Sequence, residues 1–238
     1  SDKEKLEIYG IKKKNYFLKD GLDFLEVVNP VTYMPFAGTY TLRGKKAYLE
    51  KFRVVPELQD ALKYYEEKYG SGGLMLNSFE SFDLETKTST APYVPIDYEE
   101  KIRYAEEVLS QYEYEYERDP EVSLKQLLDL LPKAYSRYEE KRKEARFVSE
   151  ANVYIYLPEE KMCKISCKGE GYEVIDKKEF NDTKYVSYAL DYKLLYRILR
   201  GPRFAHWNNA EIGSHISFAR RPEIYERGLY WSMNYFHA

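Results

Sequence analysis

The chain has 238 residues, of which 44% are hydrophobic and 32% are charged, a balance typical of a globular protein with room for two compact parts. With 37 basic and 40 acidic residues, its net charge of −3 argues against general binding to nucleic acids or to membrane surfaces. Its apolar runs are too short to span a bilayer and none resembles a signal peptide, so we expect a cytoplasmic protein.

The first part of the chain carries apolar residues at helical spacing. They predict a helix over residues 3–28, which we expect Gly10 and Gly21 to interrupt. The next expected elements are a buried strand, a helix ended by glycines and a second buried strand: Val31–Met34, Pro56–Tyr69 and Leu74–Leu76. Residues 1–77 would then form part of an α/β layer, and this part should expose apolar surface.

Residues 78–150 are expected to form a connecting arm followed by helices. The polar, turn-rich stretch that opens this segment leads to a helix starting near Asp97. Asp119 should cap the next helix, because a proline suited to the first turn and a glutamate follow it directly. Pro132 should then kink or divide that helix.

From residue 151 onward, apolar residues alternate with polar ones, which is the pattern of strands. Asp191 should cap a helix that ends at Gly201. We expect residues 151–238 to form an α+β domain with helices and a small, mostly antiparallel sheet. Its expected strands are 151–157, 162–168, 172–174, 185–189 and 216–218.

The two cysteines, Cys163 and Cys167, would lie on one face of an extended strand about 13 Å apart, too far for a disulfide. Without further cysteines or a nearby histidine, their spacing also makes a poor zinc site, so we expect free thiols. Tyrosine supplies 26 of the 238 residues. Packing at half-buried positions explains this number, and an aromatic ligand groove is the alternative.

The polar segment from His206 to His215 gathers two of the three histidines, two amides, a carboxylate and a tryptophan. Imidazoles and a carboxylate can bind a divalent metal, and amides can orient a sugar or an acid. The separation of the histidines matches no common local zinc spacing. A structural alternative is a turn between a helix and a strand, with the tryptophan packed on the sheet. The candidate ligand contacts in this segment are His206, Asn208, Asn209, Glu211 and His215.

Several arginines flank this segment in the sequence. Arg220 follows the last expected strand, where a guanidinium can hold a phosphate or carboxylate through two hydrogen bonds. Ion pairs with nearby glutamates are the alternative. The closing segment 230–237 is strongly aromatic, so we expect it to dock on the core or on a missing half of the protein. The arginines of this region are Arg200, Arg203, Arg220, Arg221 and Arg227.

The run Tyr33–Tyr40 resembles the end of a late strand in the metallo-β-lactamase superfamily, where a metal-binding histidine often stands in a Pro-apolar-His-aromatic-Gly-Thr run. Ala37 stands near the place of that histidine, and no His-x-His-x-Asp-His cluster occurs in the sequence. The resemblance implies that Phe36, Thr39 and Tyr40 form one wall of a substrate site. It transfers no metal ligand to this chain.

Residues 151–220 follow an order of strands, Asp-capped helix, glycine stop and further strand that resembles the sterol-carrier-protein-2-like fold. Some alkylsulfatase-type members of the metallo-β-lactamase superfamily carry such a domain at their carboxy terminus, so the two resemblances support each other. The expected fold is α+β. It combines a partial α/β layer of a metallo-β-lactamase-like fold (1–77), a helical arm (78–150) and a sterol-carrier-like domain (151–238).

The chain as a whole resembles the back half of bacterial metallo-β-lactamase-fold proteins related to L-ascorbate-6-phosphate lactonase and CMP-N-acetylneuraminate hydroxylase. The resemblance implies a metal-dependent hydrolase, or a hydroxylase-like enzyme, for a small anionic sugar or nucleotide-sugar. One or two zinc or iron ions would be held by the absent amino-terminal half or a complementary subunit, and this chain alone would bind none and be inactive. The segments on which this resemblance rests are Asn29–Pro30, Tyr33–Tyr40, Leu42–Lys45, Asn77–Asp83 and Trp207–His215.

Two other classes of function stay open at this point. The first is a non-catalytic binding module for an apolar or aromatic ligand. The second is an assembly domain of an oligomer, which would use the aromatic tail and the exposed α/β edge. The tunnel of the binding module would be lined by Val153, Ile155, Tyr185, Leu195 and Trp231.

Overall fold

The computed structural model describes residues 2–36 and 40–238, with side chains described from Glu7 onward. The chain divides into two compact units, Ser1–Tyr112 and Glu113–Ala238. The fold is mixed α+β, as the sequence predicted. The expected division into three domains stays a prediction, and its middle segment is shared between the two units.

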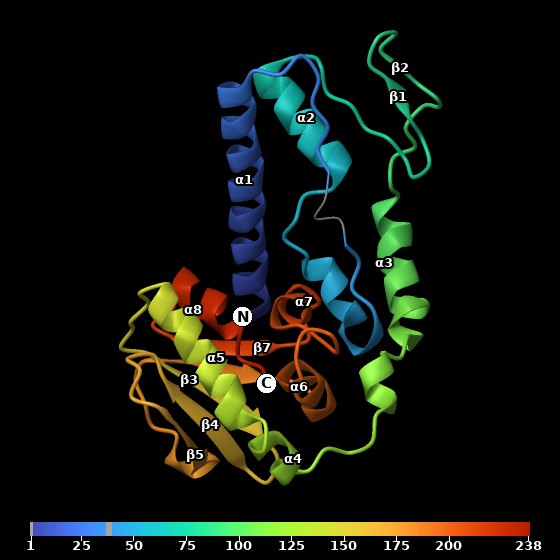
Figure 1. Ribbon diagram of the computed structural model, residues 1–238. Helices are drawn as coiled ribbons and strands as arrows, with labels where there is room; N and C mark the ends of the chain where they lie inside the picture. Colours follow the sequence, from blue (N-terminus) through green and yellow to red (C-terminus); the bar gives the residue numbers. More distant parts are fainter. Residues whose placement is uncertain (1, 37–39) are drawn as a thin grey trace. The chain divides into compact units, whose positions relative to one another are not determined.

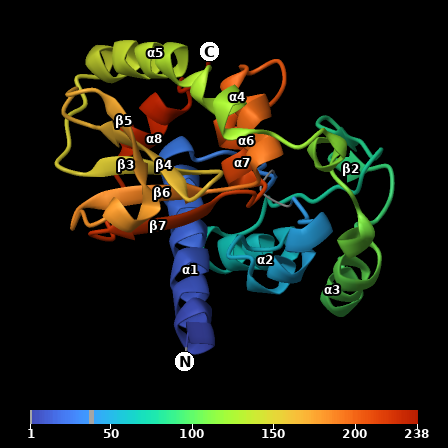
Figure 2. The same ribbon diagram turned by 90° about the horizontal axis from the view of Figure 1, so that it is seen from below.

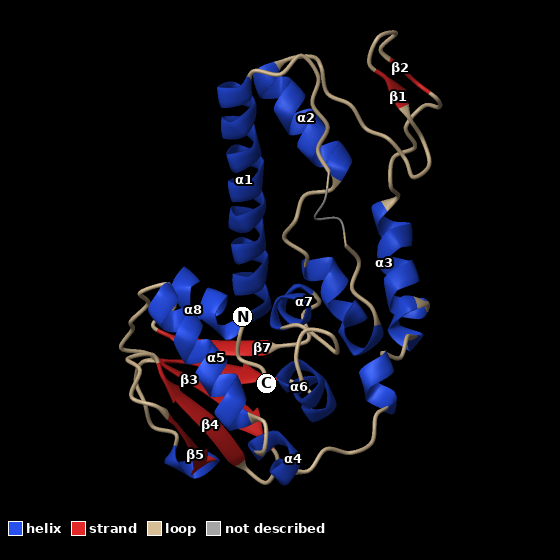
Figure 3. Ribbon diagram, viewed as in Figure 1, coloured by secondary structure: helices blue, strands red, loops and turns tan. Residues whose placement is uncertain are grey.

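Unit 1 is mainly helical, with one two-stranded hairpin (Figures 1 and 3). Its long helix α1 packs against α2, and the 3-10 helix at Gly44–Phe52 packs against α3. Asp97 caps α3 as predicted, because its side chain accepts a hydrogen bond from the backbone N–H of Glu100 at 3.0 Å. The elements are α1 (Asp2–Val28), α2 (Leu58–Tyr69), β1 (Phe82–Asp83), β2 (Thr88–Ser89), α3 (Tyr98–Glu107) and a 3-10 turn (Leu109–Gln111).

The expected breaks in the first helix are wrong, because α1 runs without interruption to Val28. A side chain at Gly21 would collide with the ring of Tyr65, which lies against the helix backbone at this point. Gly10 similarly faces Val54 at contact distance. These glycines allow other side chains to approach α1 closely, and that packing outweighs their low helix propensity.

The two strands expected in unit 1 are reduced to a single parallel bridge between Tyr33 and Gly73. Two backbone hydrogen bonds form it: Tyr33 N–H to the carbonyl of Gly72 at 3.0 Å, and Leu74 N–H to the carbonyl of Tyr33 at 2.9 Å. Within the described residues no further strand pairs with either segment. Val31 is 80% exposed and Phe36 76%, which confirms the expected apolar surface.

A buried ionic cluster connects the middle segments of unit 1. Arg53 forms ion pairs with Glu50 at 3.2 Å and with Glu57, and Lys101 of α3 reaches Glu57 at 2.7 Å and Glu50 at 3.5 Å. Glu50 also accepts a hydrogen bond from the backbone N–H of Leu42 at 2.9 Å. Two carboxylates and two cations therefore balance one another out of contact with water.

Unit 2 is built on a five-stranded sheet in the order β5-β4-β3-β6-β7. Every neighbouring pair is antiparallel except β3 and β6, which are parallel. The predicted strands are therefore confirmed, with shifted ends. The elements are η3 (Glu115–Arg118), α4 (Leu124–Leu128), α5 (Leu131–Glu144), β3 (Asn152–Leu157), β4 (Lys161–Ser166), β5 (Tyr172–Asp176), η4 (Lys177–Glu179), β6 (Tyr185–Ala189), α6 (Tyr192–Leu199), α7 (Trp207–Ile212), β7 (Ser217–Arg221) and α8 (Arg227–Met233).

The helices of unit 2 bury one face of this sheet. In Figures 1 and 2 both views place α5 and α8 over the strands, and these two helices contact each other. Alternate strand residues such as Val153, Ile155 and Tyr188 point into this layer and meet Leu195 and Leu199 of α6. The single core that results holds the sheet and helices together through apolar burial.

One predicted cap in unit 2 is wrong, and two other predictions are confirmed. Asp119 does not cap a helix, because α4 begins five residues later with Ser123 as its cap and Asp119 instead binds Arg197. Pro132 divides the helical region as expected and stands in the first turn of α5, where its missing N–H costs no hydrogen bond. The Asp191 cap of α6 is confirmed by a hydrogen bond from the backbone N–H of Lys193 at 2.8 Å.

The aromatic tail docks on the core of unit 2, as predicted. Phe236 is fully buried, and its carbonyl accepts a hydrogen bond from the indole N–H of Trp207 at 2.8 Å. Both cysteines are free and buried, and burial raises the pKa of Cys167 to about 11. No helix in the described ranges combines the length and the apolar composition needed to cross a membrane.

Candidate functional site

The polar segment singled out in the sequence folds as a short helix, α7, rather than as the expected turn. His206 caps it, since its Nδ1 accepts a hydrogen bond from the backbone N–H of Asn208 at 3.1 Å. Trp207 enters the core, whereas Asn208 and Asn209 are exposed. Capping α7 is a sufficient structural role for a histidine at this position.

His215 lies at the other end of this segment, among tyrosines. Its Nδ1 is 3.1 Å from the hydroxyl of Tyr116, and the ring of Tyr114 meets its edge at a centroid distance of 4.5 Å. Burial raises the pKa of the Tyr116 hydroxyl, so this group stays protonated. His206 and His215 therefore have separate surroundings and do not form a pair.

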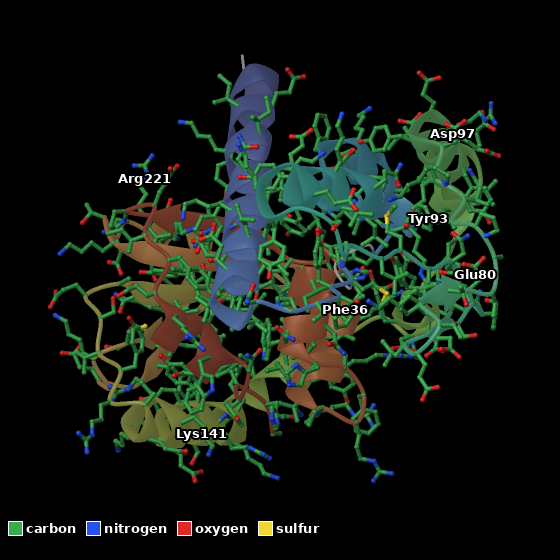
Figure 4. All side chains as sticks on the ribbon, turned by 90° about the horizontal axis from the view of Figure 1, so that it is seen from above. Phe36, Glu80, Tyr93, Asp97, Lys141 and Arg221 are labelled. Atoms are coloured by element: carbon green, nitrogen blue, oxygen red, sulfur yellow. The ribbon has the colours of Figure 1, made fainter. Side chains whose placement is uncertain are left out.

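Two of the expected site residues, Glu211 and Arg220, are close enough to influence each other electrostatically. Arg220 on edge strand β7 pairs with Val186, so it faces the helix side of the sheet, where its Nη1 donates to the hydroxyl of Tyr230 at 2.9 Å. Burial raises the pKa of the Glu211 carboxyl on α7, and the positive charge of Arg220 partly opposes this rise. Arg221, the next residue, is exposed and labelled in Figure 4.

Tyr188 belongs to the same region, and sequence reasoning missed it. Only 2% of its surface is exposed, and its hydroxyl has no hydrogen-bond partner among the described residues. Burial raises the pKa of this hydroxyl, and the nearby Tyr230 and Glu211 add to the rise. A tyrosine at an inward strand position looks like ordinary core, so no sequence signal marks its unpaired hydroxyl.

The expected site residues of unit 1 lie in open surroundings. Phe36, labelled in Figure 4, is exposed, and the side chain of Tyr40 is exposed as well. The carbonyl of Tyr40 accepts a hydrogen bond from Nη1 of Arg53 at 2.9 Å. Ala37 and Thr39 lie outside the described residues.

Two of the expected arginines line a cleft of about 480 Å³ in unit 2. One wall of this cleft is formed by residues of the segment 115–126. The other wall is formed by the end of α6 and the residues that follow it, up to Phe204. Arg197, Arg200 and Arg203 all line it. We call it the arginine cleft.

The charges in the arginine cleft are only partly balanced. Arg197 donates two hydrogen bonds to Asp119, at 2.5 and 2.8 Å, and these hold the pKa of that carboxyl below its usual range. Its Nη1 also lies 3.5 Å from Glu115. Among the described residues, no carboxylate lies within ion-pair distance of Arg200 or Arg203.

Aromatic rings hold one of these free guanidiniums in place. The Arg200 guanidinium lies 3.8 Å from the ring centroid of Phe204 and 5.5 Å from that of Tyr196. Arg203 is exposed at the rim. The sequence had suggested Arg200 and Arg203, but their aromatic neighbours and the Asp119 pair depend on a contact between residues far apart in the chain.

The described residues offer no metal-binding set. In residues 2–36 and 40–238 no three histidine, cysteine, aspartate or glutamate side chains converge as ligands of a metal ion would. Of the residues expected to line an apolar tunnel, three are packed in the core, namely Val153, Ile155 and Leu195. Tyr185 is half-buried and Trp231 is exposed.

Comparison of the chain with protein-family models, with curated proteins and with solved structures found no match.

Proposed function

We propose that unit 2 binds a small anionic ligand, such as a sugar phosphate or a nucleotide, in the arginine cleft. The observation that carries this proposal is the pair Arg200 and Arg203, which lie in one cleft without a carboxylate partner among the described residues. Two such guanidiniums can each donate two hydrogen bonds to a phosphate or carboxylate.

The walls of the cleft support the same conclusion. Because Phe204 and Tyr196 already restrict Arg200, this side chain loses little conformational freedom when it binds an anion. Arg197 is held by Asp119, so it stiffens the cleft wall and leaves the other two arginines to the ligand. The volume of about 480 Å³ is ample for a monosaccharide phosphate and falls within the usual range of small-molecule sites.

The wider setting that we propose for this cleft is a metal-dependent hydrolase of the metallo-β-lactamase superfamily. Its support is the resemblance of Tyr33–Tyr40 and Trp207–His215 to that superfamily, together with the fit of an anion-binding cleft to a small anionic sugar or nucleotide-sugar. The metal ligands would belong to residues outside this chain. A sterol-carrier-like architecture for residues 151–238 is part of the same proposal.

Calorimetric titration tests the cleft. We expect glucose 6-phosphate and cytidine monophosphate to bind, whereas uncharged glucose and cytidine should not. Arg200→Gln and Arg203→Gln should each weaken binding about tenfold or more, since a hydrogen bond to a charged group contributes about 1.5–3 kcal/mol.

The matched control is Arg137→Gln, which removes an exposed arginine on α5 and should leave binding unchanged. Equal loss in all three variants would indicate attraction by net charge alone and would contradict the proposed site. Unchanged binding in the Arg200 and Arg203 variants would contradict it as well.

A further inference from the structure

The side of α1 that points away from α2 carries large apolar side chains exposed to solvent. On the packed side, Leu18 and Leu22 are buried, and Gly21 lies against Tyr65 of α2. Residues seven apart share one face of a helix, so the exposed aromatic residues form a continuous stripe. We call it the outer face of α1: Tyr9, Lys13, Tyr16, Phe17, Asp20, Phe24 and Val27.

An exposed stripe of this kind is characteristic of an interaction surface. Phe24 and Val27 are among the most exposed apolar residues of the chain, at 68% and 85%. Single exposed apolar residues need no explanation, but a stripe that follows one helix face over several turns does. The helix presents a second amphipathic side, beyond the one that packs within unit 1.

The outer face of α1 carries one charge of each sign. Lys13 stands in the amino-terminal half of the stripe and Asp20 in its carboxy-terminal half. Other lysines of α1 already form ion pairs within the chain: Lys14 with Asp60 at 2.9 Å and Lys19 with Asp23 at 2.7 Å. Lys13 and Asp20 are therefore the charges of α1 that an external partner would meet on this face.

We propose that the outer face of α1 binds the same face of a second copy of this chain, with the two helices antiparallel. An antiparallel pair related by a two-fold axis brings Lys13 of each helix beside the partner's Asp20. In the register that sets Lys13 opposite the partner's Asp20, Tyr9 lies level with the partner's Phe24. Tyr16 then lies level with the partner's Phe17.

A second copy of this chain would explain why the outer face of α1 carries charges of both signs, which a different partner protein would not require. Self-complementarity needs both signs of charge on one helix face, placed on opposite sides of the stripe centre, and Lys13 and Asp20 have this arrangement. A parallel pair would instead place lysines beside lysines and acids beside acids. The aromatic residues around Lys13 and Asp20 supply the apolar contact, and the ion pairs set the direction. This inference goes beyond the proposed ligand binding and does not depend on it.

Analytical ultracentrifugation of the full chain, from low to high micromolar concentration, tests this proposal. We expect a monomer–dimer equilibrium, which Phe24→Ser should weaken by about tenfold or more. Lys13→Glu and Asp20→Lys should each weaken it similarly, and the double variant K13E/D20K should restore it, because the ion pairs re-form with reversed signs.

The control is Lys68→Glu on α2, an exposed charge outside the outer face, which should not change association. Circular dichroism verifies that each variant keeps its helix content. A chain that stays monomeric at all concentrations overturns the proposal, and then the outer face is covered by another part of the chain or by a different protein. A dimer indifferent to the outer-face variants overturns it too.

Discussion

The interactions inside unit 2 differ in kind from those inside unit 1. Unit 2 has a continuous apolar core between one sheet and its helices, in which residues such as Ile165, Leu195 and Phe236 are fully buried. Unit 1 has few buried apolar side chains, and its middle segments are joined by the ionic cluster of Glu50, Arg53 and their neighbours. Two parts of one chain can thus be organised differently, one by apolar burial and the other by balanced buried charge.

Similar apolar runs in the sequence form strands in unit 2 but not in unit 1. Short apolar runs in unit 2 form strands because each is hydrogen-bonded to a neighbouring strand of the sheet. The runs at Val31–Met34 and Leu74–Leu76 look equally strand-like, but they share only the bridge between Tyr33 and Gly73. A strand is stabilised by its neighbours, so the local pattern alone does not determine whether it forms.

The largest effect should come from the ionic cluster of unit 1. Glu50→Gln leaves Arg53 and Lys101 with only one buried carboxylate, which should lower the free energy of unfolding by about 3–5 kcal/mol. Urea denaturation followed by circular dichroism measures it, with Asp23→Asn as the control for an exposed ion pair, expected to cost less than about 1 kcal/mol. Equal small losses would show that the cluster does not hold unit 1 together.

A second, somewhat smaller effect is expected in the core of unit 2. Leu195→Ala should lower the free energy of unfolding by about 2–5 kcal/mol, because it leaves a cavity between α6 and the sheet. Both tryptophans, Trp207 and Trp231, belong to unit 2, so their fluorescence follows this unit alone. Glu50→Gln should therefore shift the unfolding transition seen by tryptophan fluorescence much less than Leu195→Ala does. Equal shifts would contradict the view that the two units are stabilised by separate interactions.

The smallest effect concerns pH. Burial raises the pKa of Glu211 above its ordinary value of 4.5, so folded unit 2 binds this proton more tightly than the unfolded chain does. The free energy of unfolding should therefore decrease as the pH rises from 4.5 toward the folded pKa. Glu211→Gln should remove that decrease, and identical slopes for the two proteins in tryptophan-monitored denaturation would contradict it.

Local signals in the sequence predicted much of the fold. The caps at Asp97 and Asp191, the division at Pro132 and the strands of unit 2 follow from residue preferences and spacing that act over a few residues. The close approach of Tyr65 to Gly21 depends on another helix, so the sequence indicated a break where packing allows none. The parallel pairing of β3 with β6 is equally invisible in a local pattern.

The candidate site shows the same limit. Arg200 and Arg203 could be named from the sequence as candidate anion-binding residues, because charge and residue type are local properties. Their freedom from carboxylates could not, since it depends on Asp119 binding Arg197, a residue 78 positions away. The unpaired hydroxyl of Tyr188 likewise results from the burial of a whole layer of side chains.

Nuclear magnetic resonance titration of the isotope-labelled chain with cytidine monophosphate shows whether the arginine cleft binds a small anion. We expect saturable shifts concentrated at residues 115–126 and 196–204, which line the cleft. In the variant R200Q/R203Q these shifts should be lost while the rest of the spectrum is unchanged. Shifts elsewhere in unit 2, or cleft shifts that survive this double substitution, would exclude the arginine cleft as the binding site.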